Sequence, residues 1–200
     1  IVDNATFIYS SSATQTLSGV ISGTGALTKD TDTSSVLTLS NTNTYTGVTT
    51  INAGTISVGT IGNGGAAGNL GQATNASTNI VLGGGTLKYT GSTATSDRAF
   101  TITAGTTGTI DVPTGVTLTL AGATGTTTTG ALTKTNSGTL NLSGVNTYTG
   151  TTTISAGTLA ITGSGSLNSG SYAGSIVDNA TFIYSSSATQ TLSGVISGTG

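Results

Sequence analysis

The 200-residue chain contains no Cys, His, Met, Trp or Glu, only one Pro, and 5% charged residues. The absence of Cys excludes disulfide bonds and thiol chemistry. A single Pro and the lack of a three-residue period exclude a collagen-like or polyproline rod, despite 32 Gly residues. No apolar run approaches the roughly 20 residues that a transmembrane helix needs. Four basic residues and a pI near 4.4 argue against nucleic acid binding, because too few cations are present to neutralise phosphates.

The residues that are abundant are Thr, with 48 copies, Gly, and the apolar third of the chain. Disordered chains combine low hydrophobicity with high net charge, and this chain has neither, since its net charge is -2. Apolar residues alternate with polar ones, as a half-buried strand requires, and nowhere do they recur at helical spacing. The alternating runs are 5–10, 36–40, 78–84, 99–105, 116–122 and 139–144. Gly and Asn clusters between them, such as residues 62–71, supply positive-φ corners.

One long segment of the chain is duplicated, because residues 1–25 recur unchanged as residues 176–200. Chance does not produce such an identity, so the sequence is periodic, with Ile176 equivalent to Ile1. We interpret residues 1–175 as one full repeat unit and residues 176–200 as the start of the next. The expected molecule is a continuous rod without a linker, cut from a longer array.

A weaker repeat lies inside the repeat unit. The sequence GALTK occurs at 25–29 and 130–134, and the segment 36–58 aligns with 139–161. The first copy holds two extra residues between Lys29 and Leu37, which predicts a loop at a coil corner. Short strands, Gly/Asn corners and an open-ended repeat predict an all-β parallel β-solenoid without helices. At roughly 20–25 residues per coil, the unit makes about seven to nine coils and a rise of roughly 35–43 Å.

The segments 23–58 and 129–161 resemble the autotransporter-associated β-strand repeat of bacterial surface and secreted passenger proteins. The resemblance rests on the order G-x-L-x-K, then T-L-x-L-S-G-x-N-T-Y-T-G, then A-G-T-L, and it covers about a third of the chain. It implies a right-handed parallel β-helix that is exported through the outer membrane and displayed at the cell surface or released. The first copy departs from the pattern, with DTDTSSV where the second has the Gly-containing NSGT.

Residues that could carry chemistry are scarce. Asp30 and Asp32 share a face by strand alternation, but they lie in the inserted loop, so we expect solvated side chains rather than a catalytic pair. The Gly clusters at 62–65 and 83–85 lack the Asp of the calcium-binding nonapeptide. The sequence therefore predicts no enzyme, no catalytic residue, no cofactor and no metal site.

Two surface features remain as binding candidates. The NTYTG motifs at 43–47 and 146–150 predict corners in which Asn and Gly take positive φ while Tyr45 and Tyr148 cover the coil edge, or else Tyr-bearing contacts for glycans. Stacked Asn amides could form ladders. Thr117 and Thr119 face outward from strand 116–120, and such T-x-T pairs on successive coils could bind ice, although their register is irregular.

The function that the sequence favours is structural, that of a segment of a long extracellular fibre or stalk. Its expected partners are neighbouring copies along the axis, other rods or cell-surface glycans, with no nucleic acid and no membrane insertion. The alternatives are a ligand-binding solenoid that uses exposed Thr and Tyr ladders for glycan or ice, and a subunit that assembles end to end.

Overall fold

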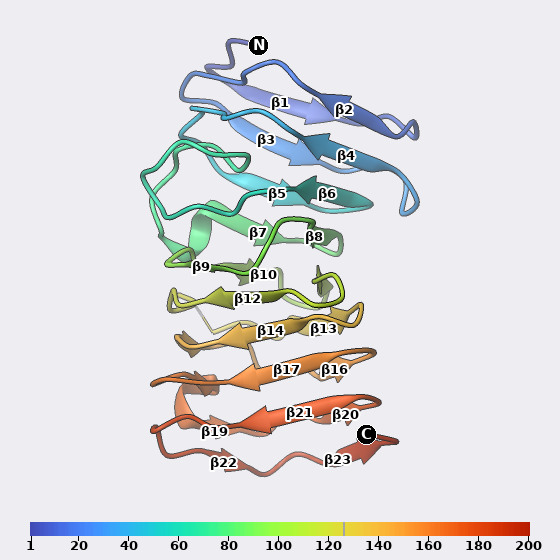
Figure 1. Cartoon of the computed structure of the whole chain (residues 1–200), viewed down its shortest axis with the longest axis vertical. Helices are drawn as coiled ribbons and strands as arrows, with labels where there is room; N and C mark the ends of the chain where they lie inside the picture. The colour runs from blue at the N-terminus through green and yellow to red at the C-terminus, as the bar shows by residue number, and fades with distance from the viewer. Residues whose placement is uncertain (126) are drawn as a thin grey trace.

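The structure, a computed structural model, describes residues 1–125 and 127–200. The chain winds into a rod of stacked coils, with its two termini at opposite ends (Figure 1). Every strand of one coil pairs in parallel with a strand of the coil before or after it, as in Leu37 with Ile56 and Leu140 with Leu159. The predicted all-β parallel β-solenoid is confirmed. Its right-handed coiling stays a prediction from the resemblance.

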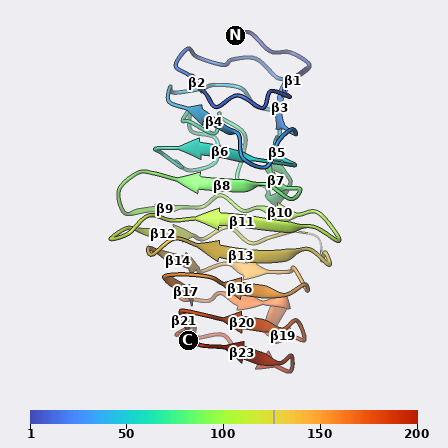
Figure 2. The same ribbon diagram turned by 90° about the vertical axis from the view of Figure 1, so that its right-hand side faces the viewer.

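One sheet runs the whole length of the rod and contributes one strand to each of about nine coils (Figure 2). Its strands, in spatial order, are β2 (Gln15–Leu17), β4 (Val36–Leu39), β6 (Thr55–Val58), β8 (Thr86–Tyr89), β11 (Thr107–Asp111), β13 (Ala131–Thr135), β16 (Thr152–Ile154), β20 (Ile176–Asp178) and β23 (Ile196–Gly198). The coil number agrees with the sequence estimate. We call this the long sheet.

Two five-stranded sheets flank the long sheet. The N-terminal sheet contains β1 (Thr6–Tyr9), β3 (Ala26–Lys29), β5 (Thr49–Ile51), β7 (Ile80–Leu82) and β10 (Thr101–Ile102). The C-terminal sheet contains β9 (Ala94–Ser96), β12 (Thr117–Leu120), β14 (Thr139–Leu142), β17 (Thr158–Ile161) and β21 (Thr181–Tyr184). Two strand pairs complete the coils, namely β15 (Val145–Asn146) with β18 (Ser166–Leu167) and β19 (Ser171–Tyr172) with β22 (Thr191–Leu192).

Helical structure in the described part of the chain is limited to two single 3-10 turns, η1 (Ser77–Asn79) and η2 (Asn168–Gly170). Five of the six predicted alternating runs contain a strand of three or four residues, and the sixth, 99–105, contains only the two-residue β10. The expectation of no α-helix is therefore met within these residues.

The core is a stripe of apolar side chains along the rod axis. Strand alternation sends every second side chain inward, and in-register pairing stacks these side chains in columns. One column of the long sheet contains Leu37, Ile56, Leu87 and Ile110, all 2% exposed or less. Each coil thus buries apolar surface against both neighbours, which is how a solenoid gains stability without disulfides.

Two corners depart from the regular coil. The interval between register partners along the long sheet is longest at the step from Thr55 to Thr86, whereas the steps on either side run only from Val36 to Thr55 and from Thr86 to Thr109. The surplus forms a projecting segment, residues 59–79, which we call the extended coil (Figure 1, on the left). Several glycines in it, among them Gly62, have positive φ, as predicted for the Gly-rich cluster.

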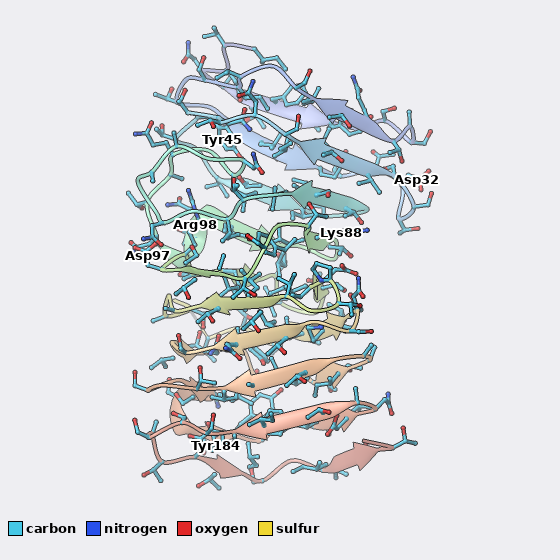
Figure 3. All side chains as sticks on the ribbon, viewed as in Figure 1. Asp32, Tyr45, Lys88, Asp97, Arg98 and Tyr184 are labelled. Carbon is cyan, nitrogen blue, oxygen red and sulfur yellow. The ribbon has the colours of Figure 1, made fainter. Side chains whose placement is uncertain are left out.

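The second departure is the two-residue insertion that the sequence placed between Lys29 and Leu37. Six residues, 30–35, separate β3 from β4, whereas three, 136–138, separate β13 from β14. The longer corner carries Asp32 at the projecting edge of the rod (Figure 3). The insertion therefore lies at a corner, as expected.

Candidate functional site

The acidic corner does not bring its two carboxylates to bear on one point. Asp30 Oδ1 accepts hydrogen bonds from Ser10 Oγ at 2.8 Å and Thr31 Oγ1 at 3.0 Å. Asp32, in the left-handed region with φ 59°, accepts from the Ser34 backbone N–H at 2.8 Å and hydroxyl at 2.7 Å. These bonds from Ser34 lower the pKa of the Asp32 carboxyl. Both side chains stabilise the corner that carries them.

Metal-ligating residues are sparse in the described part of the chain, where no three His, Cys, Asp or Glu side chains are grouped so as to hold an ion. The Gly clusters at 62–65 and 83–85 form corners: Gly65 donates to the Ala73 carbonyl, and Gly83 and Gly85 donate to that of Ile51. The absence of a metal site stays a prediction.

The first NTYTG motif lies inside the coil. Asn43 accepts from the Ile21 N–H at 2.8 Å and donates to the Asn69 carbonyl at 2.8 Å, so its amide bridges three coils. Tyr45 is fully buried (Figure 3), and its hydroxyl lies 2.7 Å from Thr49 Oγ1. Burial raises the pKa of Tyr45 to about 12. The motif is thus an internal polar brace.

The second NTYTG motif forms a larger brace. Thr152 Oγ1 lies 3.0 Å from the hydroxyl of Tyr148 and 2.8 Å from that of Tyr172, whose hydroxyl also donates to the Gly150 carbonyl. The two rings meet edge to face at 5.9 Å. Burial raises the pKa of both tyrosines. Asn146 donates to the carbonyls of Gly144 and Ser166.

Three expectations for NTYTG are corrected by this geometry. The structural interpretation holds, but Tyr45 and Tyr148 fill the interior rather than cover a coil edge, so they cannot form an external Tyr ladder. The Asn and Gly residues of the motif have no positive φ. A Cβ on Gly47 or Gly150 would lie 2.2 or 2.4 Å from a carbonyl oxygen of the adjacent coil, so close backbone approach selects Gly there. The described Asn amides bond mainly to backbone groups rather than to each other.

Two buried lysines were not recognised from the sequence. Lys29 and Lys134 end the GALTK strands at inward positions, Lys134 between Ile110 and Ile154, and both are 0% exposed. The Lys134 amine donates to the carbonyls of Thr135 and Asn136 at 2.6 Å and of Ala156 at 3.3 Å. The Lys29 amine donates to the Thr31 carbonyl. Burial lowers the pKa of Lys29, and that of Lys134 to about 8.

The lysines hold the corners of the coil. Their stems occupy the core column and their amines reach the corner carbonyls that no strand pairs. A signal existed in the sequence, because Lys falls in phase with the buried Leu of the same GALTK strand. In a lone polar residue that phase is easily taken for a strand end.

A third buried cation, Arg98, holds the extended coil. Its guanidinium donates to the carbonyls of Gly71 at 2.9 Å and Ala73 at 3.3 Å. Beside it, Asp97 accepts from the Gly64 N–H at 2.7 Å and from Asn75 Nδ2 at 3.3 Å (Figure 3). Like the lysines, Arg98 is structural and has no role at the surface, because its side chain is 2% exposed.

The outward face of the long sheet carries the candidate binding surface. Thr55, Thr86, Thr109, Thr133 and Thr153 stack in register as one column, all half-buried by their neighbours. The adjacent column is mixed, with Lys88, Asp111 and Thr135 in register. On the C-terminal sheet, Thr119 pairs with Asn141. Successive coils therefore present single Thr columns and not matched T-x-T pairs, so the predicted irregular register is confirmed.

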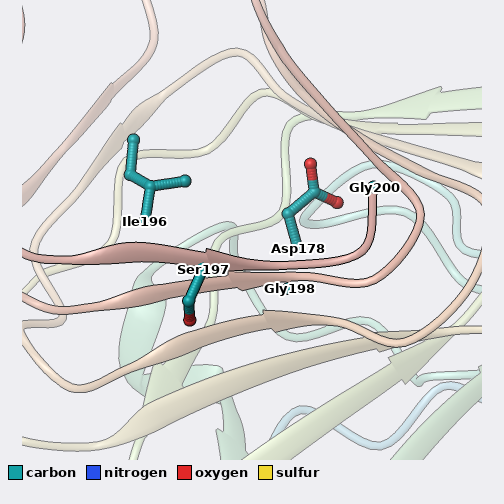
Figure 4. A pocket seen from close by; sticks show the side chains of 5 residues that line it. All are labelled: Asp178, Ile196, Ser197, Gly198 and Gly200. Carbon is teal, nitrogen blue, oxygen red and sulfur yellow. The ribbon is translucent and has the colours of Figure 1, made fainter.

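A hollow of about 190 Å³ lies at the last coil, lined by Asp178, Ile196, Ser197, Gly198 and Gly200 (Figure 4). Asp3, Gly23 and Gly25 form the same corner in the first copy, and there the next coil covers it and Asp3 is 8% exposed. The hollow is thus a coil surface on which a further coil can pack rather than a ligand cavity.

Comparison with known proteins identifies the repeated blocks. Residues 34–58 and 132–161 match the Passenger-associated-transport-repeat family. The chain carries two copies of an autotransporter passenger repeat. The adhesin BmaC autotransporter of Brucella suis biovar 1 (strain 1330) is 48% identical over 120 residues, which are 59% of this chain and 3% of that protein. This chain therefore spans a small part of its relative's length. No solved structure matches it.

The two copies, passenger repeat 1 (residues 34–58) and passenger repeat 2 (residues 132–161), make the chain a β-solenoid segment of an autotransporter passenger. Such a segment is surface-exposed or secreted, as the sequence resemblance implied. The described residues include no helix with the length and apolar character to span a membrane.

Proposed function

We propose that this chain is a spacer segment of a long extracellular stalk, built by tandem copies of the repeat unit, residues 1–175. A stalk must be continuous along its axis and stiff. The long sheet supports this function, because its parallel ladder passes through all coils, including the boundary between Ser175 and Ile176, without a break. The apolar stripe beneath it is continuous as well.

The observation that carries the proposal is the equivalence of the two copies of the duplicated segment, residues 1–25 and 176–200. In the first copy, the following coil stacks in register on β1 and β2, with Thr6 on Ala26 and Gln15 on Leu37. The second copy offers the same side chains to whatever follows, and its open hollow matches the corner that the next coil covers in the first copy. A further unit can therefore stack on residues 176–200 without a linker.

The relative supports an adhesive role for the whole protein, since its name describes an adhesin. Within such a protein, this segment would hold the adhesive region away from the cell. Passenger repeats are not a family known for enzymatic activity, and the absence of catalysis in this segment stays a prediction.

The mass of the denatured native polypeptide tests the proposal. Each unit adds about 17 kDa, since the 200 residues weigh 19.2 kDa. A mass of many such increments, with rods that lengthen by roughly 37 Å per unit in electron micrographs, is the expected result. A native polypeptide near 19.2 kDa would contradict the covalent array and favour subunits that assemble end to end.

A second candidate function is ligand binding by the Thr column of the long sheet. The unbroken run from Thr55 to Thr153 favours it, because five hydroxyls line up along the rod. The probes are a glycan array and ice crystals grown in the protein's presence. Retention or shaped crystals that are lost in a Thr109→Val, Thr133→Val double variant would establish this role. Binding unchanged by the variant would exclude the column.

A further inference from the structure

Identical sequence occupies different faces of the rod in the two copies of the duplicated segment. In the first copy, the TFIY strand β1 belongs to the N-terminal sheet. In the second copy, the same TFIY strand, β21, belongs to the C-terminal sheet and pairs with β17. Likewise QTL pairs in the long sheet as β2, whereas its counterpart β22 pairs with β19 on another side.

The local structure of the two copies is nevertheless the same. Asp3 accepts hydrogen bonds from Ala5 and Phe7, and Asp178 accepts them from Ala180 and Phe182, at 3.1 and 3.2 Å in both cases. The hydroxyls of Tyr9 and Tyr184 each donate to the carbonyl four residues ahead. The change of face is therefore not a distortion of one copy.

The rod has three faces that the chain visits in a fixed order. From β7 to β12 the chain passes the N-terminal sheet, the long sheet and the C-terminal sheet, and then passes all three again. β1 precedes the first strand of the long sheet, and β21 follows its eighth strand. The step from β1 to β21, which is one repeat unit, therefore completes seven coils and two further faces. The unit is not a whole number of coils.

We infer that the sequence period is out of phase with the coil, so that each repeat unit is rotated by two of three faces relative to the unit before it. This inference rests on the proposed tandem array for its consequence along the rod. Three units, about 23 coils, then restore the starting orientation after roughly 110 Å at about 4.8 Å per coil. The extended coil, which recurs once per unit, is displayed on all three faces in turn.

The rotation sets how partners meet the stalk. A partner that binds the extended coil can approach an array from any side, because successive copies project in three directions about 37 Å apart along the axis. Two rods cannot align the same extended coils along one shared face over more than one unit. The phase therefore favours display over side-by-side bundling.

Disulfide trapping in the 200-residue chain tests the phase itself, independently of any array. Thr158 and Thr181 are register partners, so a Thr158→Cys, Thr181→Cys variant is expected to form a disulfide in the folded chain, in which native cysteines are absent. If the unit spanned whole coils, Thr181 would instead stack above β19, and a Ser171→Cys, Thr181→Cys variant would be trapped. A Thr6→Cys, Ala26→Cys pair is the matched control on the N-terminal sheet.

Mass spectrometry and non-reducing gels score the three variants. Trapping of the 158–181 and 6–26 pairs, but not of 171–181, supports the inference. Trapping of 171–181, or failure of 158–181 while the control is trapped, overturns it.

The native polypeptide provides the second readout. Helical reconstruction from electron micrographs is expected to give two thirds of a turn for each rise of roughly 37 Å. An array without rotation between units would overturn the three-face display, whereas a one-unit mass would overturn the array alone.

Discussion

The A-L-T-K strand of the first repeated block is β3 in the N-terminal sheet, and that of the second is β13 in the long sheet. Neighbouring strands and flanking corners differ between these positions, yet the interior contacts recur. In both copies the Lys amine binds corner carbonyls, and the Tyr hydroxyl meets a Thr four residues ahead. The passenger repeat thus specifies the cross-section of a coil and not the face that it occupies.

The largest effect should follow from the glycine of NTYTG, where both copies depend on the same close approach. A Cβ at position 47 or 150 would enter the carbonyl of Gly25 or Gly130, and backbone cannot give way as a side chain can. We expect Gly47→Ala and Gly150→Ala to lower the free energy of unfolding by about 3 kcal/mol each.

The matched control is Gly19→Ala, because a Cβ there meets nothing within 4 Å. Urea unfolding of the three variants gives the comparison. Losses of the same size at positions 19 and 150 would show that the cost is general to glycine and not due to coil-to-coil approach.

The buried lysines predict a rise of stability with pH. The folded-state pKa of Lys134 is about 8, below the unfolded value of 10.5, so between these values the unfolded chain binds the additional proton and the free energy of unfolding increases with pH. Above pH 10 the sign reverses, because buried tyrosines such as Tyr45, with a pKa of about 12, keep protons that the unfolded chain loses. Stability should therefore peak near pH 10, roughly 1–2 kcal/mol above its value at pH 7 after allowance for solvent screening.

Two variants separate these contributions. Lys134→Met should flatten the rise between pH 8 and 10, and Tyr45→Phe should reduce the fall above pH 10. Unfolding midpoints in urea at pH 7, 9, 10 and 11 provide the measurement. An unaltered rise in the Lys134→Met protein would mean that its amine is not the titrating group.

The two tyrosine braces should differ in their dependence on one hydroxyl. Tyr45 is the partner of Thr49, whereas Thr152 keeps Tyr172 when Tyr148 is changed. Because a buried hydroxyl that loses its partner costs more than one that retains another, Tyr45→Phe should destabilise by about 1 kcal/mol and Tyr148→Phe by less. Thermal unfolding of both variants tests this order, and a larger loss for Tyr148→Phe would contradict it.

Local pattern predicted the strands well and the corners only in part. Alternation alone placed β4 and β14 and the side chains that they bury. It missed Lys29 and Lys134, because an amine in a core column makes sense only when the corner carbonyls are in place. It assigned Gly47 and Gly150 to positive φ, because the carbonyl that selects glycine belongs to the adjacent coil and is distant in sequence. The face of each copy depends on the summed lengths of all coils, including the extended coil, which no single motif encodes.

The smallest effect is expected where the two copies differ most in sequence, at the corner between the Lys and the next strand. Deletion of Thr33 and Ser34 would shorten corner 30–35 toward the length of corner 136–138, and both residues are exposed. The deletion removes the bonds from Ser34 to Asp32 but shortens a surface loop, so we expect a change within about 0.5 kcal/mol.

Removing Asn136 and Ser137 from the second copy is the control, since that corner has no surplus and Lys134 binds the Asn136 carbonyl. Urea unfolding of the two deletions should show a large loss only in the second copy. If shortening the first corner were equally damaging, its extra residues would be part of the coil rather than an insertion into it, and the alignment of the two passenger repeats at this corner would be wrong.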